Sequence, residues 1–440
     1  MRAPGSVRHS GRPASQPSPD RLPRLLPAGF AAGPASLADH LARYGPAQPA
    51  GLTGPRRAVL INRAVLIKEV ERSGLTGRGG AAFPTARKLA AVAAGHDPVV
   101  VANGTEGEPA SVKDKILLAR SPHLVLDGAV LAAELVGARQ TVIVVHHAVR
   151  EIIDEAVAER RRAGADPIQI RLVTAADRFV AGEASAVVHW IERGIPTPTA
   201  TPPRMSARGL GGKPTLVQNV ETLAHLALIG RFGASWFRSA GTATEPGTML
   251  VTVLGAVRQP CVQEIAIGTR VGEVLETAGG TSAPLQALLI GGYFGRWVDA
   301  AAAAAAPFSS AGLAPLGASV GAGLIAALPA NACGLTETAR VTRYLADQSA
   351  RQCGPCLFGL DAIAGEIQRL AEGRTSDLAR LRRWLGQVNG RGACSHPDGA
   401  VRLISSALTV FAAELDQHAQ GWCCGSAKTP ILPVPPRWQS

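Results

Sequence analysis

Three short apolar runs, separated by segments with helical spacing, constrain the fold of this 440-residue chain more than any other feature. The runs cover residues 98–102, 141–145 and 168–173 and are rich in valine and isoleucine. The segments between them, 121–137 and 148–162, place apolar residues three and four positions apart, as helices with one buried face do. Runs of this kind are typical of buried parallel strands, and the strand–helix–strand order requires crossover connections. The sequence therefore predicts an α/β domain with a parallel sheet.

Changes in composition along the rest of the chain predict its domain boundaries. Short strands with one small helix favour a compact β-grasp-like module in the middle of the chain. Helix formers with apolar residues at three- and four-residue steps favour a helical bundle toward the C-terminus. We predict a disordered basic tail (1–50), an α/β domain (51–240), a β-grasp-like domain (246–300), an alanine- and glycine-rich linker (301–330), a helical bundle (331–420) and a C-terminal tail (421–440).

The formal net charge of +12 bears on the partner and the compartment. The arginines are scattered and no DNA- or RNA-binding motif accompanies them, so we expect no nucleic-acid partner. A basic surface also suits an acidic protein, such as a small electron carrier. No apolar run of about 18 residues predicts membrane insertion, and the N-terminus lacks the apolar segment of a secretory signal. We therefore expect a cytoplasmic protein with reduced thiols.

A glycine-rich segment at residues 77–85, Gly-Arg-Gly-Gly-Ala-Ala-Phe-Pro-Thr, is the first motif with chemical meaning. Glycines let the backbone approach a ligand and point successive N–H groups at an anion. Lys88 follows in a predicted helix, where its charge adds to the helix dipole at a phosphate. The motif is neither a Walker loop nor G-x-G-x-x-G, and an ordinary turn is the alternative interpretation.

Polar side chains follow the first predicted strand. Asn103, Glu106 and Glu108 come directly after it, at the end where open α/β sheets bind ligands. An asparagine can hydrogen-bond a flavin edge, and two carboxylates can hold a ribityl chain or a nicotinamide amide. A solvated acidic loop is the alternative interpretation.

Two further segments open predicted helices with small or polar residues. They are 182–186 (Gly-Glu-Ala-Ser-Ala) and 214–222 (Pro-Thr-Leu-Val-Gln-Asn-Val-Glu-Thr). Backbone donors at such positions meet a phosphate or a flavin ring.

In order and context, these four segments resemble the FMN-binding segments of the NADH-binding flavoprotein subunit of respiratory complex I. That family also covers flavoprotein subunits of NAD-dependent formate dehydrogenases and bifurcating hydrogenases. Its pattern is G-R-G-G-A-G-F-P-T followed by Lys, then N-A-D-E-x-E-P, G-E-E-T-A and P-T-x-V-N-N-V-E-T. The resemblance covers about residues 55 to 415. It implies a flavin domain, a ligand-binding β-grasp (SLBB-type) domain and a helical domain that carries an iron–sulfur cluster.

The resemblance implies a set of site residues, although Thr105 and Gln218 replace an aspartate and an asparagine of the family pattern. Phe83 matches the aromatic that packs on the dinucleotide. Glu106 and Glu108 match carboxylates of the catalytic centre. The residues implied for FMN are Gly77, Arg78, Gly79, Gly80, Lys88, Asn103, Glu106, Gly182, Glu183, Asn219 and Thr222.

The nicotinamide cofactor side departs further from the family. Ala184 replaces a glutamate that helps to hold the adenosine ribose, and Ala90 or Ala91 replaces an aromatic. Residues 201–204 (Thr-Pro-Pro-Arg) replace Lys-Pro-Pro-Phe. Each loss weakens binding by roughly 10- to 100-fold. We therefore expect weakened NADH binding, with NADPH as the alternative, because a lost carboxylate removes repulsion against a 2′-phosphate.

Seven cysteines gathered toward the C-terminus argue for a metal-type site rather than a disulfide framework. Cys353, Cys356 and Cys394 match three of the four ligands in the family's cluster motif, S-C-G-x-C-x-P-C-R-x-G plus a distal Cys, whereas Ala350 stands at the first. We expect a [4Fe–4S] cluster with incomplete protein ligation. A zinc site that adds His396, or no metal at all, are the alternatives. The other candidate donors are Cys333, His396, Cys423 and Cys424.

The resemblance implies an oxidoreductase subunit that passes electrons from NADH or NADPH through FMN and the cluster to a carrier protein. The expected partner is a small iron–sulfur carrier, ferredoxin-like or thioredoxin-like. A degenerate scaffold that has lost NADH oxidation is one alternative. A ligand-binding scaffold built around the β-grasp module is another.

Overall fold

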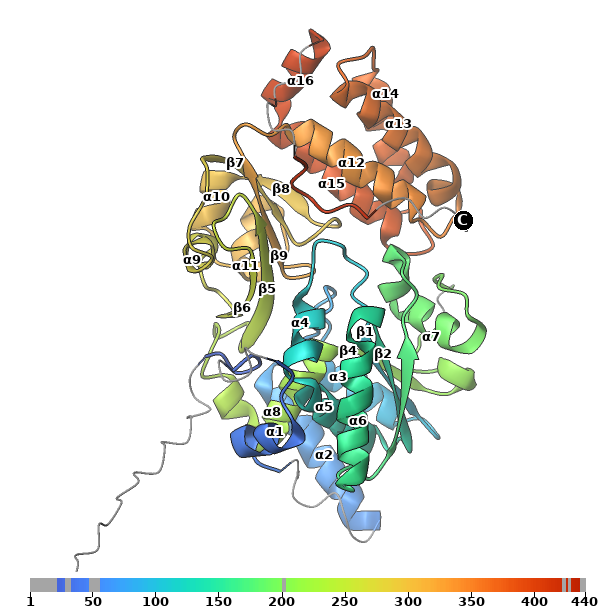
Figure 1. The fold of residues 1–440 in the computed structure, drawn as a ribbon. Coiled ribbons are helices and arrows are strands. Elements are labelled where there is room, and N and C mark those ends of the chain that lie inside the picture. The colour runs from blue at the N-terminus through green and yellow to red at the C-terminus, as the bar shows by residue number, and fades with distance from the viewer. Residues whose placement is uncertain are drawn as a thin grey trace, which may run out of the picture.

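The computed structural model describes residues 22–27, 33–46, 56–199, 203–421, 425 and 429–435. They form an α/β layer, a mixed β-sheet with small helices, and a helical unit, which follow one another along the chain (Figure 1). The predicted donors Cys423 and Cys424 and the departures at 201 and 202 lie outside the described residues. Within the described part, no single helix is long and apolar enough to cross a membrane; helices α4 (Lys113–Arg120) and α5 (Pro122–Val136) pass that test only as a pair, and they meet at a 97° bend.

The α/β unit is built on a four-stranded parallel sheet with the order β3-β2-β1-β4. The three predicted strands are confirmed, but 215–219 form strand β4 rather than the opening of a helix, and helix α8 begins only after Asn219. Because β1 lies between β2 and β4, Asn103 is level with Asn219 at the carboxyl edge of the sheet. The elements are α2 Arg56–Ser73, α3 Thr85–Ala93, β1 Val99–Gly104, α4 Lys113–Arg120, α5 Pro122–Val136, β2 Gln140–Val145, α6 Arg150–Arg162, β3 Gln169–Thr174, α7 Ala184–Arg193, β4 Thr215–Asn219 and α8 Val220–Phe237.

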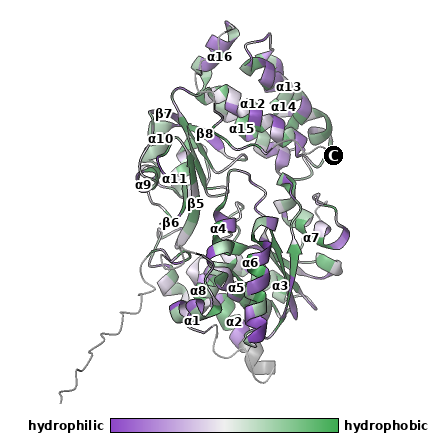
Figure 2. Ribbon diagram, in the orientation of Figure 1, coloured by the Kyte–Doolittle hydropathy of each residue, from purple (hydrophilic) through white to green (hydrophobic). Residues whose placement is uncertain are grey.

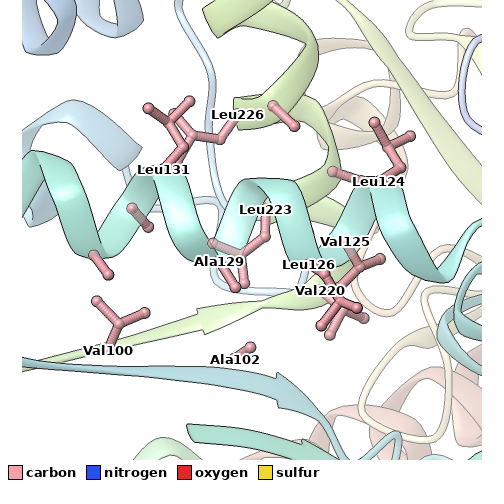
Figure 3. Packing of buried hydrophobic residues seen from close by; sticks show 14 of the residues in the cluster. Val100, Ala102, Leu124, Val125, Leu126, Ala129, Leu131, Val220, Leu223 and Leu226 are labelled. Atoms are coloured by element: carbon pink, nitrogen blue, oxygen red, sulfur yellow. The ribbon is translucent and has the colours of Figure 1, made fainter. Parts of the chain in front are cut away.

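The core of this unit is the contact between α5 and α8 over strand β1 (Figure 3). Helix α5 is buried along most of its length, and most of its residues are apolar, which Figure 2 colours green. The two helices touch where Gly128 faces the backbone of Leu223, since a Cβ at Gly128 would lie 1.9 Å from the Leu223 carbonyl oxygen. A glycine therefore sets how closely these helices approach.

The predicted tails are partly wrong. Leu25 is fully buried, and Arg24 donates to Ser239 Oγ at 2.7 Å, so this short segment is fastened to the α/β unit. Residues 37–44 form helix α1 (Leu37–Tyr44), which begins with a capping box at Ser36. Near the C-terminus, Leu432 is buried and its N–H donates to Glu337 at 3.0 Å. The composition suggested disorder because the few apolar residues that become buried are separated by prolines and arginines.

The middle unit has a five-stranded sheet with the order β6-β5-β9-β7-β8. The prediction of a linker over 301–330 is wrong, because β9 is the central strand, parallel to β5 and antiparallel to β7. Its six residues are all buried. A single short run rich in alanine carries little strand signal until neighbouring strands enclose it. The elements are β5 Thr248–Gly255, β6 Cys261–Ala266, α9 Val271–Thr277, β7 Leu285–Ile290, β8 Arg296–Asp299, α10 Ala300–Ala305, α11 Ser310–Leu313 and β9 Leu324–Pro329.

The C-terminal unit is the predicted helical bundle. Its helices pack through leucine, isoleucine and alanine side chains at helical spacing around α12, α13 and α15. A π-helical turn, η6 (Pro355–Gly359), interrupts the chain between the first two of these, and such turns are frequent at functional sites. The elements are α12 Gly334–Asp347, α13 Leu360–Ala371, α14 Leu378–Val388, α15 His396–Val410 and α16 Ala412–Ala419.

Gly128→Ala should destabilise the protein by at least about 2 kcal/mol, because the added methyl group forces α5 and α8 apart. The matched control is Gly386→Ala in α14, where a Cβ would meet no atom within 4 Å and where alanine should stabilise the helix by up to about 1 kcal/mol. Urea unfolding followed by circular dichroism measures both. Equal midpoints for Gly128→Ala and the wild type would contradict the close approach.

Candidate functional site

A cavity of about 700 Å³ lies where the three units meet. Its volume falls within the roughly 300–1,000 Å³ of small-molecule and cofactor sites. All the predicted flavin and nucleotide residues except Thr222 line it, as does the predicted catalytic Glu108. The lining includes Gly77, Arg78, Gly79, Gly80, Phe83, Lys88, Asn103, Glu106, Glu108, Gly182, Glu183, Asn219, Gly291, Phe294, Ser319, Gly321, Cys394, His396 and Arg402. Motifs far apart in sequence thus share one space, while the binding roles of these residues stay predictions.

The glycine loop is held over the start of α8. The Gly77 N–H donates to the Phe83 carbonyl at 2.9 Å, and the Arg78 N–H donates to Thr222 Oγ1 at 2.8 Å. A Cβ at Gly79 would approach the Asn219 side chain to 3.2 Å, so this position has little room for a larger residue. Thr222 therefore fixes the loop from behind rather than lining the cavity.

Lys88 is a cation without a carboxylate partner. Its Nζ donates to the Val217 carbonyl at 2.5 Å, and burial lowers the pKa of its ammonium group. Among the described residues no carboxylate lies within ion-pair distance of it. An enclosed ammonium with only a carbonyl to bond is stabilised by an anion, so the side chain suits the phosphate of FMN.

Hydrogen bonds within the protein already occupy part of the side chains of Asn103 and Glu106. Asn103 donates to the Gly182 carbonyl at 2.9 Å, which ties the β1 edge to the segment before α7. The Glu106 carboxylate accepts from the N–H groups of Asp114 and Lys115 at 3.0 and 2.9 Å. Glu106 thus caps α4 from the cavity wall, and its predicted roles in catalysis and FMN binding must be shared with this structural one.

Glu108 joins the α/β unit to the middle unit. Its carboxylate accepts from the Tyr293 N–H at 2.8 Å and from the Ala110 N–H at 3.4 Å. Burial of the carboxylate raises its pKa to about 7, against the opposing effect of these hydrogen bonds. Although the residue as a whole is only half-buried, its acidic group is enclosed. A carboxyl group with such a pKa can hold or release a proton near neutrality.

The floor of the cavity contains charged residues that sequence reasoning missed. Lys113 Nζ lies 2.7 Å from both Asp114 Oδ1 and Glu221 Oε2. Asn219 donates to the second oxygen of Asp114 at 2.7 Å. No local motif signals this group, because Lys113 and Glu221 are 108 residues apart. Phe294, Ser319 and Arg402 were missed for the same reason.

Two residues that match the family pattern, Glu183 and Phe83, and one that departs from it, Ala184, line the cavity. Glu183 matches the family and caps α7 through the N–H groups of Ser185 and Ala186 at 2.8 and 3.0 Å. Ala184 lines the cavity, so its missing carboxylate concerns the site directly. Phe83 lines it too and remains half-exposed, where a planar ligand can reach the ring.

Three thiols meet beside this cavity. Cys356 is buried on the turn η6, and burial raises its pKa to about 12, with further contributions from Cys353 and Cys394. Cys394 precedes α15 and also lines the cavity. Ala350 offers no donor atom. This donor set matches three corners of an iron–sulfur cluster, and it adjoins the space expected to hold flavin.

The structure keeps one of the other candidate donors, His396, beside Cys394 and places another, Cys333, apart from the three thiols. His396 lines the same cavity as Cys394; its Nε2 lies 2.7 Å from the Leu345 carbonyl oxygen, and its ring packs against Phe179 and Phe294. Cys333 caps the far end of α12, roughly 20 Å of helix away, where its Sγ lies 3.3 Å from His418 Nε2. Among the described residues, no group of three His, Cys, Asp or Glu side chains is placed to hold a single metal ion. Thiolates of a cluster bind different irons and therefore lie farther apart.

A cavity lined by a glycine loop and by Cys394, with Cys353 and Cys356 close to that thiol, is the site of a redox protein of the flavin and iron–sulfur class. Residues 70–228 match the family described as the Nuo51 FMN-binding domain. Residues 250–289 match the SLBB domain, and residues 336–418 match the NADH-ubiquinone oxidoreductase-F iron–sulfur binding region.

Whole-chain comparisons agree with these matches. The chain is 29% identical to the second of the NADH-quinone oxidoreductase F subunits of Rhizobium meliloti, over 82% of this chain and 90% of that protein. It is 28% identical to the NADH-quinone oxidoreductase F subunit of Streptomyces coelicolor, over 85% of this chain and 87% of that protein. The crystal structure of an air-oxidized NAD+-reducing [NiFe]-hydrogenase superposes with a TM-score of 0.76 at 29% identity, covering 83% of this chain and 65% of that one. Over most of its length the chain is therefore similar to NADH-quinone oxidoreductase F subunits, and its three units match family models of the FMN-binding, SLBB and iron–sulfur regions.

Lys88→Ala should weaken FMN binding by about 1–3 kcal/mol, because a charge-assisted phosphate contact is lost. Titration of the flavin-free protein with FMN, followed by flavin fluorescence, measures the affinity. Lys68→Ala on exposed α2 is the matched control. Unchanged FMN affinity in Lys88→Ala would place the phosphate elsewhere.

Glu108 should make the flavin-free protein less stable as pH rises from 4.5 to 7. Its folded pKa lies above its ordinary value of 4.5, so the folded state binds more protons than the unfolded state in this window, and stability from this group is lost as pH rises. The loss amounts to roughly 3 kcal/mol at most. Urea unfolding of Glu108→Gln at several pH values should lack this component, whereas exposed Glu71→Gln should keep it. Parallel profiles for Glu108→Gln and the wild type would refute it.

Proposed function

We propose that this chain is an electron-transfer subunit that oxidises NADH or NADPH at FMN and passes the electrons through an iron–sulfur cluster. The observation that carries this proposal is the single cavity lined by the glycine loop and Lys88 on one side and by Cys394 on the other. FMN supplies the exchange between a two-electron hydride and single electrons. The printed names of the relatives support NADH as the donor.

The chain's own residues have distinct parts in this scheme. The loop from Gly77 to Gly80 and Lys88 bind the FMN phosphate, and Asn103 orients the flavin edge at the end of β1. Glu108 holds a proton close to the nicotinamide position, because its carboxylate is enclosed and titrates near neutrality. Phe83 packs on the dinucleotide at the mouth of the cavity. Cys394 shortens the route from the flavin to the cluster because it belongs to both sites.

A degenerate scaffold remains the second candidate function, favoured by two specific departures. Ala184 in the cavity wall lacks the carboxylate of the family pattern, and Ala350 lacks the first cluster thiolate. The colour of the purified protein separates the two functions: a yellow chain that NADH or NADPH bleaches is an enzyme subunit. A flavin-loaded chain that neither nucleotide reduces is a scaffold.

Nucleotide specificity should be relaxed, with NADH bound less tightly than the family pattern implies. Stopped-flow reduction of the bound flavin should respond to both NADH and NADPH. Ala184→Glu should strengthen the NADH response and suppress the NADPH response, because a carboxylate repels a 2′-phosphate. Saturation of the wild type by NADH at low micromolar levels, with no response to NADPH, would refute this prediction.

An exposed apolar pair marks the surface above the cluster site. Leu357 and Phe358 follow Cys356 on η6 and are 37% and 70% exposed, the only adjacent pair among the exposed large apolar residues of the described part. The segments around them, 343–361 and 378–402, carry seven arginines and three aspartates. An apolar centre with an arginine-rich surround suits an acidic protein partner. We place the docking site of a small iron–sulfur carrier here, within the multisubunit assembly that the relatives' naming as subunits implies.

Phe358→Ser should weaken binding of an acidic plant-type [2Fe–2S] ferredoxin by at least about tenfold, because the most exposed apolar contact is removed. Calorimetric titration at low and high salt measures binding without nucleotide or flavin turnover. Val65→Ser, at an apolar side chain on α2 that is 53% exposed, is the control. Loss of self-association in Phe358→Ser with unchanged ferredoxin affinity would make a second copy of the chain the occupant.

The cytoplasmic location stays a proposal, supported by cysteines that form no disulfide with one another within the described residues.

A further inference from the structure

Arg402 is a cation of the cavity wall to which the proposed function gives no part. The described lysines and arginines that line the cavity are Arg78, Lys88, Lys113 and Arg402. Lys113 forms two ion pairs, and the buried guanidinium of Arg78 donates to oxygen atoms of the protein. Lys88 is proposed to bind the FMN phosphate. The positive charge of Arg402 therefore needs an explanation of its own.

Most of the Arg402 guanidinium is available to a ligand. Its Nη1 donates to the Phe294 carbonyl at 2.7 Å, which uses one of the five N–H donors of an arginine. It makes no other hydrogen bond and no ion pair within the part of the chain that the structure describes. The side chain is exposed where it borders the cavity. Its planar fork of donors matches a phosphate group, which it can bind through two parallel hydrogen bonds.

Phe294 fixes the place of Arg402 in the wall. A Cβ on Gly399 would lie 2.2 Å from the Phe294 ring, so this ring packs directly on the backbone of α15. The ring also lies 5.4 Å from that of His396, centroid to centroid. Arg402 follows Gly399 by three residues and bonds the carbonyl of the same phenylalanine. Ring and carbonyl together hold the middle unit against one stretch of α15.

The same phenylalanine connects Arg402 with the wall where the family pattern has lost a carboxylate. The centroids of the Phe294 and Phe179 rings are 4.8 Å apart. Phe179 begins the turn η3 (Phe179–Gly182), which leads into α7 at Ala184. In Rossmann-type dinucleotide sites a carboxylate bonds the ribose 2′-hydroxyl of NADH, whereas an arginine accommodates the 2′-phosphate of NADPH. The cavity thus lacks the group that favours NADH and contains the group that favours NADPH.

We propose that Arg402 binds the 2′-phosphate of NADPH and thereby determines the nucleotide preference of the chain. The inference rests on the proposed function, for which it names the substrate. A phosphate monoester carries nearly two negative charges at neutral pH, so its contact with a guanidinium is strong. The FMN phosphate stays at Lys88, so the two phosphates have separate cations in separate units.

The test measures binding of two probes that differ only in the 2′-phosphate, adenosine 2′,5′-bisphosphate and adenosine 5′-monophosphate. Calorimetric titration of the full chain in excess FMN requires no hydride transfer. The wild type should bind the bisphosphate at least about tenfold more tightly than the monophosphate. Arg402→Gln should lose this difference and keep the monophosphate affinity. Arg402→Lys should retain part of the difference, because the charge remains without the fork. Arg383→Gln, at an exposed arginine of α14, is the control and should match the wild type.

Three outcomes would overturn the assignment. They are equal affinity of the wild type for the two probes, an unchanged difference in Arg402→Gln, and equal weakening of both probes in Arg402→Gln. The last would mean that Arg402 contacts the 5′-phosphate or only supports Phe294. Circular dichroism melting confirms that each variant is folded.

Stopped-flow reduction of the flavin separates this inference from the proposed function. A chain that neither nucleotide reduces, but that binds the bisphosphate through Arg402, lacks the proposed activity and retains the phosphate contact. A chain that NADH reduces, but that does not prefer the bisphosphate, retains the proposed activity and lacks the contact.

Discussion

The buried ion group of Lys113, Asp114 and Glu221 holds the cavity together. Burial opposes ionisation of Glu221, but the neighbouring Lys113 ammonium outweighs it and lowers the pKa of Glu221 to about 2. The second oxygen of Glu221 accepts from the Leu250 N–H at 2.8 Å, so the group ties the α/β unit to strand β5 of the middle unit. Removal of one member would leave an uncompensated buried charge, which typically costs about 3–5 kcal/mol. The relative position of two domains therefore depends on a few charges at the floor of the site.

Helix termini supply much of the remaining architecture. Glu106 caps α4, Glu183 caps α7 and Asn219 caps α8, and all three side chains line the same cavity. Each satisfies N–H groups that a helix leaves without partners. The positive ends of these helices are thereby directed toward the space where an anionic cofactor is expected. Glu106, Glu183 and Asn219 thus have a structural role at helix termini in addition to the binding roles predicted for them.

The departures from that pattern are distributed unevenly. The flavin side retains its glycines, its lysine and its asparagines, whereas the nucleotide side loses a carboxylate at Ala184 and the cluster loses a thiolate at Ala350. Arg351 keeps a glycine-like backbone in the cluster loop, so the loss of the ligand has not been followed by loss of the loop. The backbone of the cluster loop thus has the form that a glycine would favour, although the first predicted thiolate is missing.

The sequence by itself determined the local elements and the chemical types of the site. Apolar runs predicted strands β1, β2 and β3, glycines followed by Lys88 predicted an anion loop, and Cys353, Cys356 and Cys394 predicted a cluster, because these signals are contained within short windows. Only the tertiary structure decided what no window contains: that β9 completes the middle sheet, that Lys113 meets Glu221, that Cys394 lines the cavity of the glycine loop, and that Cys333 lies at the far end of α12. Each of these depends on contacts between residues tens to hundreds of positions apart. Such contacts form only when the burial of apolar surface brings the elements together. A local sequence pattern does not specify which distant residues will then meet.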